Sequence, residues 1–176
     1  EGDDSLSIAG AVLRTTVLAG VGADTLQIGS MSKTSVVAGS GNDSIVVAGT
    51  AISTTLRAGV GDDLMSLAGG IASGSLYGGD GNDSFDFTGG AATGLVDTGA
   101  GVDSVLLGGS ADSITLTGVL TSTSVTAGSG ADSILIKSNV ASGYFDISSG
   151  AHAVADDTLN LLSSSVSAVS TTIKGG

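Results

Sequence analysis

Aspartate recurs along this chain at a nearly constant interval, each time at the end of a glycine-rich stretch. The first six lie 20, 19, 20, 20 and 20 positions apart: Asp4, Asp24, Asp43, Asp63, Asp83 and Asp103. The stretches read, for example, AGVGADTLQI (19–28), GGDGNDSFDF (78–87) and AGSGADSILI (127–136). A unit of about 20 residues is too short to bury its own apolar face, so neighbouring units must stack and share one core. The sequence therefore predicts a solenoid.

Apolar residues fall two and four positions after these aspartates, a spacing typical of a strand with one face inward. The pairs are Leu26 and Ile28, Ile45 and Val47, Met65 and Leu67, Phe85 and Phe87, Val105 and Leu107, and Ile134 and Ile136. A second alternating run ends each unit, with Val17, Val36, Leu56 and Leu76 at equivalent positions. We expect an all-β chain with at least two strands per coil, and the spacing leaves open a two-sheet roll or a three-sided helix. The 30 glycines and the lack of proline suit short strands joined by tight turns.

Stacking would place the aspartates of successive coils about 4.8 Å apart, the spacing of neighbouring strands. Like charges at that distance repel by about 1 kcal/mol per pair even in bulk water. Three explanations are open: the carboxylates cap backbone N–H groups, their pKa values rise, or cations lie between them. Calcium suits a site made of carboxylate and backbone carbonyl oxygens, because it takes six to eight oxygen ligands. The Gly-x-Gly context of the aspartates after Asp4 favours the cation.

The stretch GGDGNDSFD (78–86) fits the nonapeptide GGxGxDxUx of the repeats-in-toxin (RTX) family, in which U is a large apolar residue. The other turns fit except at the first glycine, which is replaced by Ala19, Ala38, Ala58, Thr98 or Ala127. The resemblance covers about residues 1–136 and implies a right-handed parallel β-roll that binds Ca²⁺ between adjacent coils. It implies these ligands, with Asp4 as an edge member: Asp4, Asp24, Asp43, Asp63, Asp83, Asp103 and Asp132.

Most coils carry the motif once, whereas the standard roll carries a calcium turn on each side of its 18-residue coil. We therefore expect one row of ions. In this one-sided form the chain resembles the calcium-loaded ice-binding domain of a giant bacterial adhesin and repeats of surface-layer proteins. An ice-binding face needs a regular Thr/Asn ladder, whereas the outward turn positions here vary, as in Val21/Ala23 and Asp80/Asn82.

The register breaks after Asp103, because Asp112 follows after nine residues and Asp132 after 20 more. We interpret this as a nonapeptide inserted near 104–116, which gives either a protruding loop or a doubled 18-residue coil with Asp112 on the opposite side, and we favour the coil. Asp112 lacks the second turn glycine, so no ion is assigned to it. Residues 137–176 are predicted to be degenerate terminal coils or an assembly segment, with a strand resuming after Asp157 and no ion assigned there.

Charge and composition exclude several functions. A formal net charge of −12 opposes binding to nucleic acid. The chain lacks an apolar run of 18 residues, which argues against membrane insertion. The single histidine, His152, lies in an irregular turn and the five basic residues are scattered, so we predict that the chain is not an enzyme.

These observations predict an extracellular structural module, a calcium-stiffened solenoid of a surface-layer, adhesin or filament protein on the bacterial cell surface. Its expected partners are calcium ions and copies of itself or further repeats of the same protein. The chain begins inside a repeat, at Glu1, and we read it as a mature fragment or a segment of a larger protein. The alternative is a recognition module that binds carbohydrate, a cell surface or ice through a flat β-face.

Overall fold

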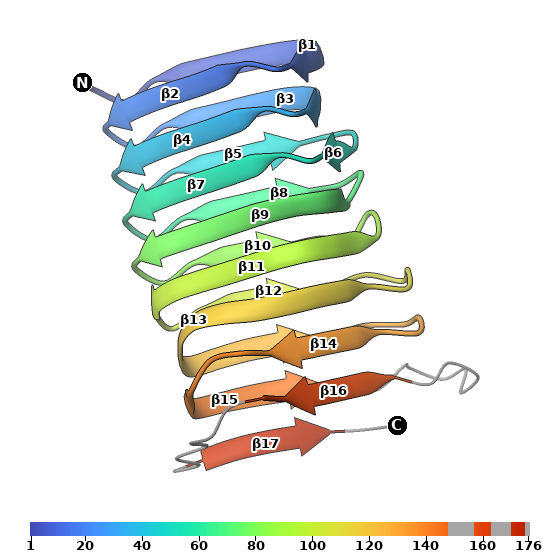
Figure 1. Ribbon diagram of the computed structural model, residues 1–176. Coiled ribbons are helices and arrows are strands. Elements are labelled where there is room, and N and C mark those ends of the chain that lie inside the picture. Colours follow the sequence, from blue (N-terminus) through green and yellow to red (C-terminus); the bar gives the residue numbers. More distant parts are fainter. Residues whose placement is uncertain (148–156, 163–169, 175–176) are drawn as a thin grey trace.

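The chain folds into a stack of β-coils that share one elongated core (Figure 1). The computed structural model describes residues 1–147, 157–162 and 170–174. Every regular element in these ranges is a strand, and every strand pairing is parallel. The prediction of an all-β solenoid is confirmed. The described residues include no helix that could cross a membrane.

Two faces alternate along the chain. Face A begins after the first six aspartates and contains β1 (Ser5–Leu13), β3 (Thr25–Ser32), β5 (Ser44–Val47), β8 (Leu64–Leu67), β10 (Ser84–Asp86), β12 (Ser104–Leu106), β15 (Val140–Asp146) and β17 (Ser170–Lys174). Face B contains β2 (Thr16–Val21), β4 (Ser35–Ser40), β7 (Thr55–Val60), β9 (Ile71–Asp80), β11 (Ala92–Gly101), β14 (Ser133–Ile136) and β16 (Thr158–Leu161). The long strand β13 (Ser113–Thr126) starts in face B and ends in face A.

A short third strand segment follows the long strand of face A in the N-terminal coils. It is clearest in β6 (Ala51–Ile52), which pairs with Met31 and Ser32 on one side and with Ile71 and Ala72 on the other. Each such coil therefore has two long sides and one short side, a form between the two-sheet roll and the three-sided helix that the spacing left open.

The core consists of the inward positions of both faces and of the short third side, which adds Val12, Met31, Ala51 and Ile71. The apolar residues predicted two and four positions after each aspartate are all buried, and so are Val36, Leu56 and Leu76 from the second run, whereas Val17 in the first coil is only half-buried. Parallel in-register pairing stacks like positions directly, as in Ile45↔Met65. The inward apolar side chains of each coil therefore pack against those of the next coil, and the core extends along the described stack.

The two edges of the stack are the turns between the faces. The first edge, from face B to face A, carries the Gly-x-Gly-x-Asp turns of the N-terminal coils, and the second edge returns from face A to face B. At the first edge the glycine backbones nearly touch: Gly59 has φ +131°, and a Cβ there would collide with the carbonyl of Gly39 in the coil before. These turns therefore require glycine both for the backbone angle and for the close approach of neighbouring coils.

The two edges exchange their turn types after Asp103. In the N-terminal coils the second edge turns through a non-glycine residue with positive φ followed by a buried threonine, as at Lys33 and Thr34. In the C-terminal part that corner lies on the first edge, at Ser122 and Thr123. The glycine turns and their aspartates lie on the second edge from Asp112 onward.

The expected insertion near 104–116 is not found. Face A continues in steps of 20, with Ser84↔Ser104↔Ser124, and face B does so as well, with Thr93↔Ser113↔Ser133. Asp112 lies on the opposite side, as we favoured, but in a coil of 20 residues rather than 18. The broken spacing reflects the change of edge, which sequence spacing alone cannot distinguish from an inserted segment.

A graded series of alanine substitutions tests the glycine turns. Gly10→Ala should be nearly neutral, because a Cβ there meets no atom and φ is unexceptional. Gly20→Ala should cost about 1–3 kcal/mol, because φ is +129°, a conformation that side-chain-bearing residues rarely adopt, although the space is open. Gly59→Ala should cost more than Gly20→Ala, because a backbone collision is added. Urea unfolding measures all three, and equal losses at Gly20 and Gly59 would contradict the close-approach argument.

Candidate functional site

Six of the predicted ligands form one column along the first edge. Each immediately precedes the face A strand of its coil, so parallel pairing places the six in line: Asp4, Asp24, Asp43, Asp63, Asp83 and Asp103. The last five side chains are buried, only 1–3% exposed, whereas Asp4 in the first coil is exposed. Carboxylates are rarely buried to this extent without a charged partner.

One oxygen of each buried carboxylate caps the coil before it. The backbone N–H of Asp43 donates to Asp63 Oδ1 at 2.7 Å, and the N–H of Asp63 donates to Asp83 Oδ1 at 3.0 Å. The same bond joins every neighbouring pair of the column, from Asp4 to Asp103. The ladder explains why the same turn geometry repeats from coil to coil, because a buried N–H without an acceptor is costly.

The second oxygen of each buried carboxylate has no hydrogen-bond partner. These atoms are the Oδ2 atoms of Asp24, Asp43, Asp63, Asp83 and Asp103 on the first edge, and of Asp112 and Asp132 on the second. Their carboxylates are therefore half-satisfied, and a buried acceptor in this state costs about 1–3 kcal/mol, more when it is charged. A proton or a cation would remove that cost.

Burial raises the pKa values of these carboxyl groups. The pKa of Asp63 rises to about 6 and that of Asp83 to about 7, chiefly through desolvation and with a smaller contribution from neighbouring carboxylates. In both, the hydrogen bond from the preceding backbone N–H acts in the opposite direction. Desolvation likewise raises the pKa of Asp43 and Asp103. Protonation of these carboxylates, or a cation bound between them, would therefore stabilise the folded column.

The turn that fits the complete nonapeptide differs from the others in one respect. Asp83 Oδ2 and the carbonyl oxygen of Thr98 both face the α-carbon of Gly78, and a side chain at Gly78 would collide with both oxygens. Two oxygens thus share a place that an alanine methyl group occupies in most other coils. In the next coil Thr98 replaces that glycine, and its hydroxyl lowers the pKa of Asp103 without meeting the geometry of a hydrogen bond.

Asp132 does not belong to this column, contrary to the expectation of a single row. It lies on the second edge, where its Oδ1 accepts the N–H of Asp112 at 2.9 Å and its own N–H donates to Asp157 Oδ1 at 3.0 Å. Asp112 begins this second column and accepts the N–H of Ala92. Burial raises the pKa of Asp112 and Asp132 as well. Asp112, Asp132 and Asp157 thus form a second column of carboxylates that cap backbone N–H groups. In the sequence, only the 20-residue step from Asp112 to Asp132 indicates this column.

A second, exposed ladder runs along the tips of the first edge, and our sequence reasoning missed it. The side-chain oxygen of Asn42 accepts the N–H of Asp62, Asp62 accepts the N–H of Asn82, and Asn82 accepts the N–H of Val102. Asp3 does the same for Ala23. In this tip ladder each N–H donor lies one coil after its acceptor, whereas in the buried ladder each N–H donor lies one coil before its acceptor. The alternation of Asn and Asp at the tips was the available signal.

The buried columns fit a cation in part. Their orphaned Oδ2 atoms and the oxygen pair at Gly78 are the ligand type that calcium prefers. No group of three or more Asp, Glu or His side chains in the described ranges is arranged so that it could hold a metal ion by itself. An ion there would therefore take at most two side-chain carboxylates and would need backbone carbonyls for the remaining ligands.

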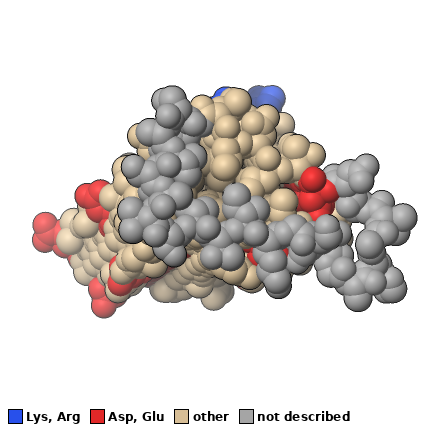
Figure 2. All heavy atoms as spheres, turned by 90° about the horizontal axis from the view of Figure 1, so that it is seen from below, with Lys and Arg blue, Asp and Glu red and all other residues tan. Residues whose placement is uncertain are grey.

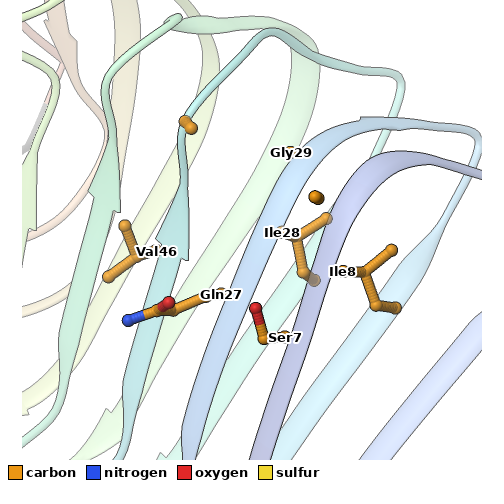
Figure 3. A pocket seen from close by; sticks show the side chains of 8 residues that line it. Ser7, Ile8, Gln27, Ile28, Gly29 and Val46 are labelled. Carbon is orange, nitrogen blue, oxygen red and sulfur yellow. The ribbon is translucent and has the colours of Figure 1, made fainter.

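A shallow groove of about 540 Å³ lies on face A across the first three coils. Figure 3 shows Ser7, Gln27 and Val46 at its border, one from each of β1, β3 and β5. These three residues occupy equivalent register positions, and the row changes from the polar Ser7 and Gln27 to the apolar Val46. His152, the only histidine, lies outside the described residues, so the absence of catalysis stays a prediction.

Comparison with protein-family models, with curated proteins and with solved structures finds no match to this chain. The resemblance to RTX repeats therefore rests on the motif and stays a prediction.

The raised pKa values predict how stability depends on pH in a chelator. Between about pH 4 and 7 the folded state binds more protons than the unfolded state, so stability should fall as pH rises through this window. The expected loss is of order 1 kcal/mol for each of Asp63 and Asp83. Urea unfolding at pH 5 and pH 8 measures it.

Asp83→Asn should flatten that dependence, because the amide carries no charge to neutralise, whereas the exposed Asp80→Asn should leave it unchanged. A stability that increases from pH 5 to pH 8 in chelator would contradict the prediction.

Proposed function

We propose that this chain is a calcium-stiffened structural solenoid of an extracellular surface-layer, adhesin or filament protein, which folds where calcium is abundant. The observation that supports the proposal most directly is the row of buried carboxylates whose Oδ2 atoms have no partner. An enclosed ladder of like charges opposes its own fold unless something neutralises it. Calcium would do so at neutral pH without breaking the backbone caps made by Oδ1.

Binding to the folded state alone links ion concentration to stability, because free ion then shifts the folding equilibrium by mass action. At 100 times the dissociation constant a single site contributes about 2.7 kcal/mol. Several sites in one stack would add, because each coil interface is stabilised separately. Such a chain would be loosely folded at low calcium and stiff at high calcium, which suits a protein exported before it folds.

The charge distribution also agrees with a structural role. Figure 2 shows acidic side chains on the lateral sides of the stack and the few Lys and Arg side chains apart from them. The outward row of face B runs Leu18, Val37, Arg57, Tyr77, Asp97 and Thr117, and the ring of Tyr77 is covered by the Arg57 guanidinium at 4.6 Å. A row this varied does not favour recognition of a periodic ligand.

Calcium titration followed by circular dichroism tests the proposal. When calcium is added to the calcium-free protein, the β-sheet signal in circular dichroism and the thermal stability should increase at sub-millimolar to millimolar concentrations. Magnesium should be much less effective, because it requires a more regular octahedral arrangement of ligands. The double variant Asp63→Asn/Asp83→Asn should need several-fold more calcium, because two neighbouring ligands are lost.

Asp80→Asn is the matched control for Asp83→Asn alone, which should also need more calcium, because Asp80→Asn removes one charge from the same turn at an exposed position. If the wild-type chain were equally folded and equally heat-stable with calcium and with chelator, the columns would be turn caps only and the proposal would fail.

A further inference from the structure

A groove crosses three neighbouring coils on face B, beside the first edge. It lies on β9, β11 and the first part of β13, and its volume is about 390 Å³. Its floor is a line of three glycines, Gly79, Gly99 and Gly118, whose lack of side chains leaves a hollow between two rows of side chains. Further coils lie on both sides, because β9 also pairs with β7 and β13 with β14, so the groove does not depend on either end of the stack.

The inner wall of the groove is formed by Tyr77 and Asp97, which are neighbours in the outward row of face B. The Arg57 guanidinium lies 4.6 Å from the centre of the Tyr77 ring and comes from the coil before it. Arg57 is not part of the groove lining, so it covers one face of the ring and leaves the side towards Asp97 open. The tyrosine is thus held in place before any ligand binds, which lowers the entropic cost of binding.

The carboxylate of Asp97 is directed along the groove. A Cβ at Gly118 would lie only 2.6 Å from Asp97 Oδ1, so this oxygen fills space that a side chain there would need. Asp80 lies on the outer wall, and the exposed side chain of Val119 lies two coils further along the same wall. Neither carboxylate has a hydrogen-bond or ion-pair partner among the described residues. Both are therefore available to a ligand.

The lining determines the chemistry of the ligand. Its two carboxylates only accept hydrogen bonds, and none of its residues is basic. Ammonium and guanidinium groups only donate, and their charge is attracted to the face of an aromatic ring. A saccharide needs donors as well as acceptors, and the Tyr77 hydroxyl is the one donor among the lining side chains.

Two basic residues of the same outward row lie outside the groove. Arg57 lies behind the Tyr77 ring, and the exposed Lys137 follows Thr117 in the row, two strands beyond Asp97. Two strand spacings are about 10 Å, which is close to the screening length in physiological salt. The carboxylates in the groove therefore dominate the charge that a ligand meets there.

We propose that this groove binds one arginine or lysine side chain of a partner polypeptide. The cationic group would lie between Asp97 and Asp80, beside the open face of Tyr77, and its aliphatic stem would extend over the glycine floor towards Val119. The volume suits a single side chain and is at the lower end of known ligand pockets. Arginine satisfies the site best, because a planar guanidinium can stack on the ring while it bonds a carboxylate.

The charge of the whole chain favours such a partner. A formal net charge of −12 attracts a basic polypeptide at long range and increases its rate of association. The site needs only the folded solenoid. The inference therefore goes beyond the proposed structural role and does not rest on calcium.

Nuclear magnetic resonance of the tyrosine rings tests the site, because the chain contains two tyrosines, Tyr77 and Tyr144. The folded chain, labelled with ¹³C-tyrosine, is titrated at low salt with Nα-acetyl-arginine methylamide. The ring signals of Tyr77 should shift and saturate in the millimolar range, because one ion pair and one cation–π contact are each weak at an exposed site. Added salt should weaken the binding.

The chain supplies an internal control. Tyr144 lies on face A with the carboxylate of Asp146 at 3.0 Å from its hydroxyl, but it is not part of the groove, so its signals should not shift. Nα-acetyl-citrulline methylamide has nearly the same shape without the charge and should not shift Tyr77. Asp97→Asn should weaken binding of the arginine probe several-fold, whereas Asp86→Asn, the same substitution on face A, should leave it unchanged. Circular dichroism checks that both variants are folded.

Equal shifts with the arginine and citrulline probes, or equal shifts at both tyrosines, would overturn the proposal. A saturable shift of Tyr77 with N-acetylglucosamine, and none with the arginine probe, would overturn it in favour of a saccharide site. Arginine-specific shifts in a chain that is equally folded in chelator would support the site while the calcium proposal fails. Calcium-dependent folding without such shifts would overturn the site alone.

Discussion

The bond from each turn N–H to the carboxylate of the following coil is the constraint on which the rest of this structure depends. Parallel stacking forces the turns of successive coils into register, and each turn buries an N–H that its own coil cannot satisfy. Aspartate reaches that group from the next coil, as in the bond from Asp43 to Asp63. The same side chain brings a charge into the interior. The geometry of the fold and its electrostatic problem therefore have one origin, and neither can be changed without the other.

The period of 20 residues and the alternation of apolar positions predict most of the fold, because both follow directly from stacking. The inward row through Ile45, Met65 and Phe85 is buried as the spacing indicates. The six-member column follows for the same reason. Sequence reasoning failed at the edge exchange after Asp103, where steps of nine and 20 describe two columns but read as one column with an insertion.

Other features could not have been read from the spacing at all. Which oxygen of each carboxylate caps the backbone, and which is left without a partner, depends on side-chain orientation in three dimensions. The raised pKa of Asp83 likewise depends on how completely its neighbours exclude water. The tip ladder through Asn42 and Asp62 would have required knowing that these side chains turn along the stack and not outward.

The opposite directions of the two ladders bear on how the stack would respond to force. A pull along its axis loads every coil interface in series. At four of the five interfaces between the turns from Asp4 to Asp103, an inner bond such as Asp63 to Asp83 and a tip bond such as Asn82 to Asp62 share the load. Each of the two coils contributes one acceptor, so a single damaged side chain leaves the interface still joined. Rupture would then spread coil by coil from a weakened end, and the rod would lengthen in steps of one repeat instead of failing at once.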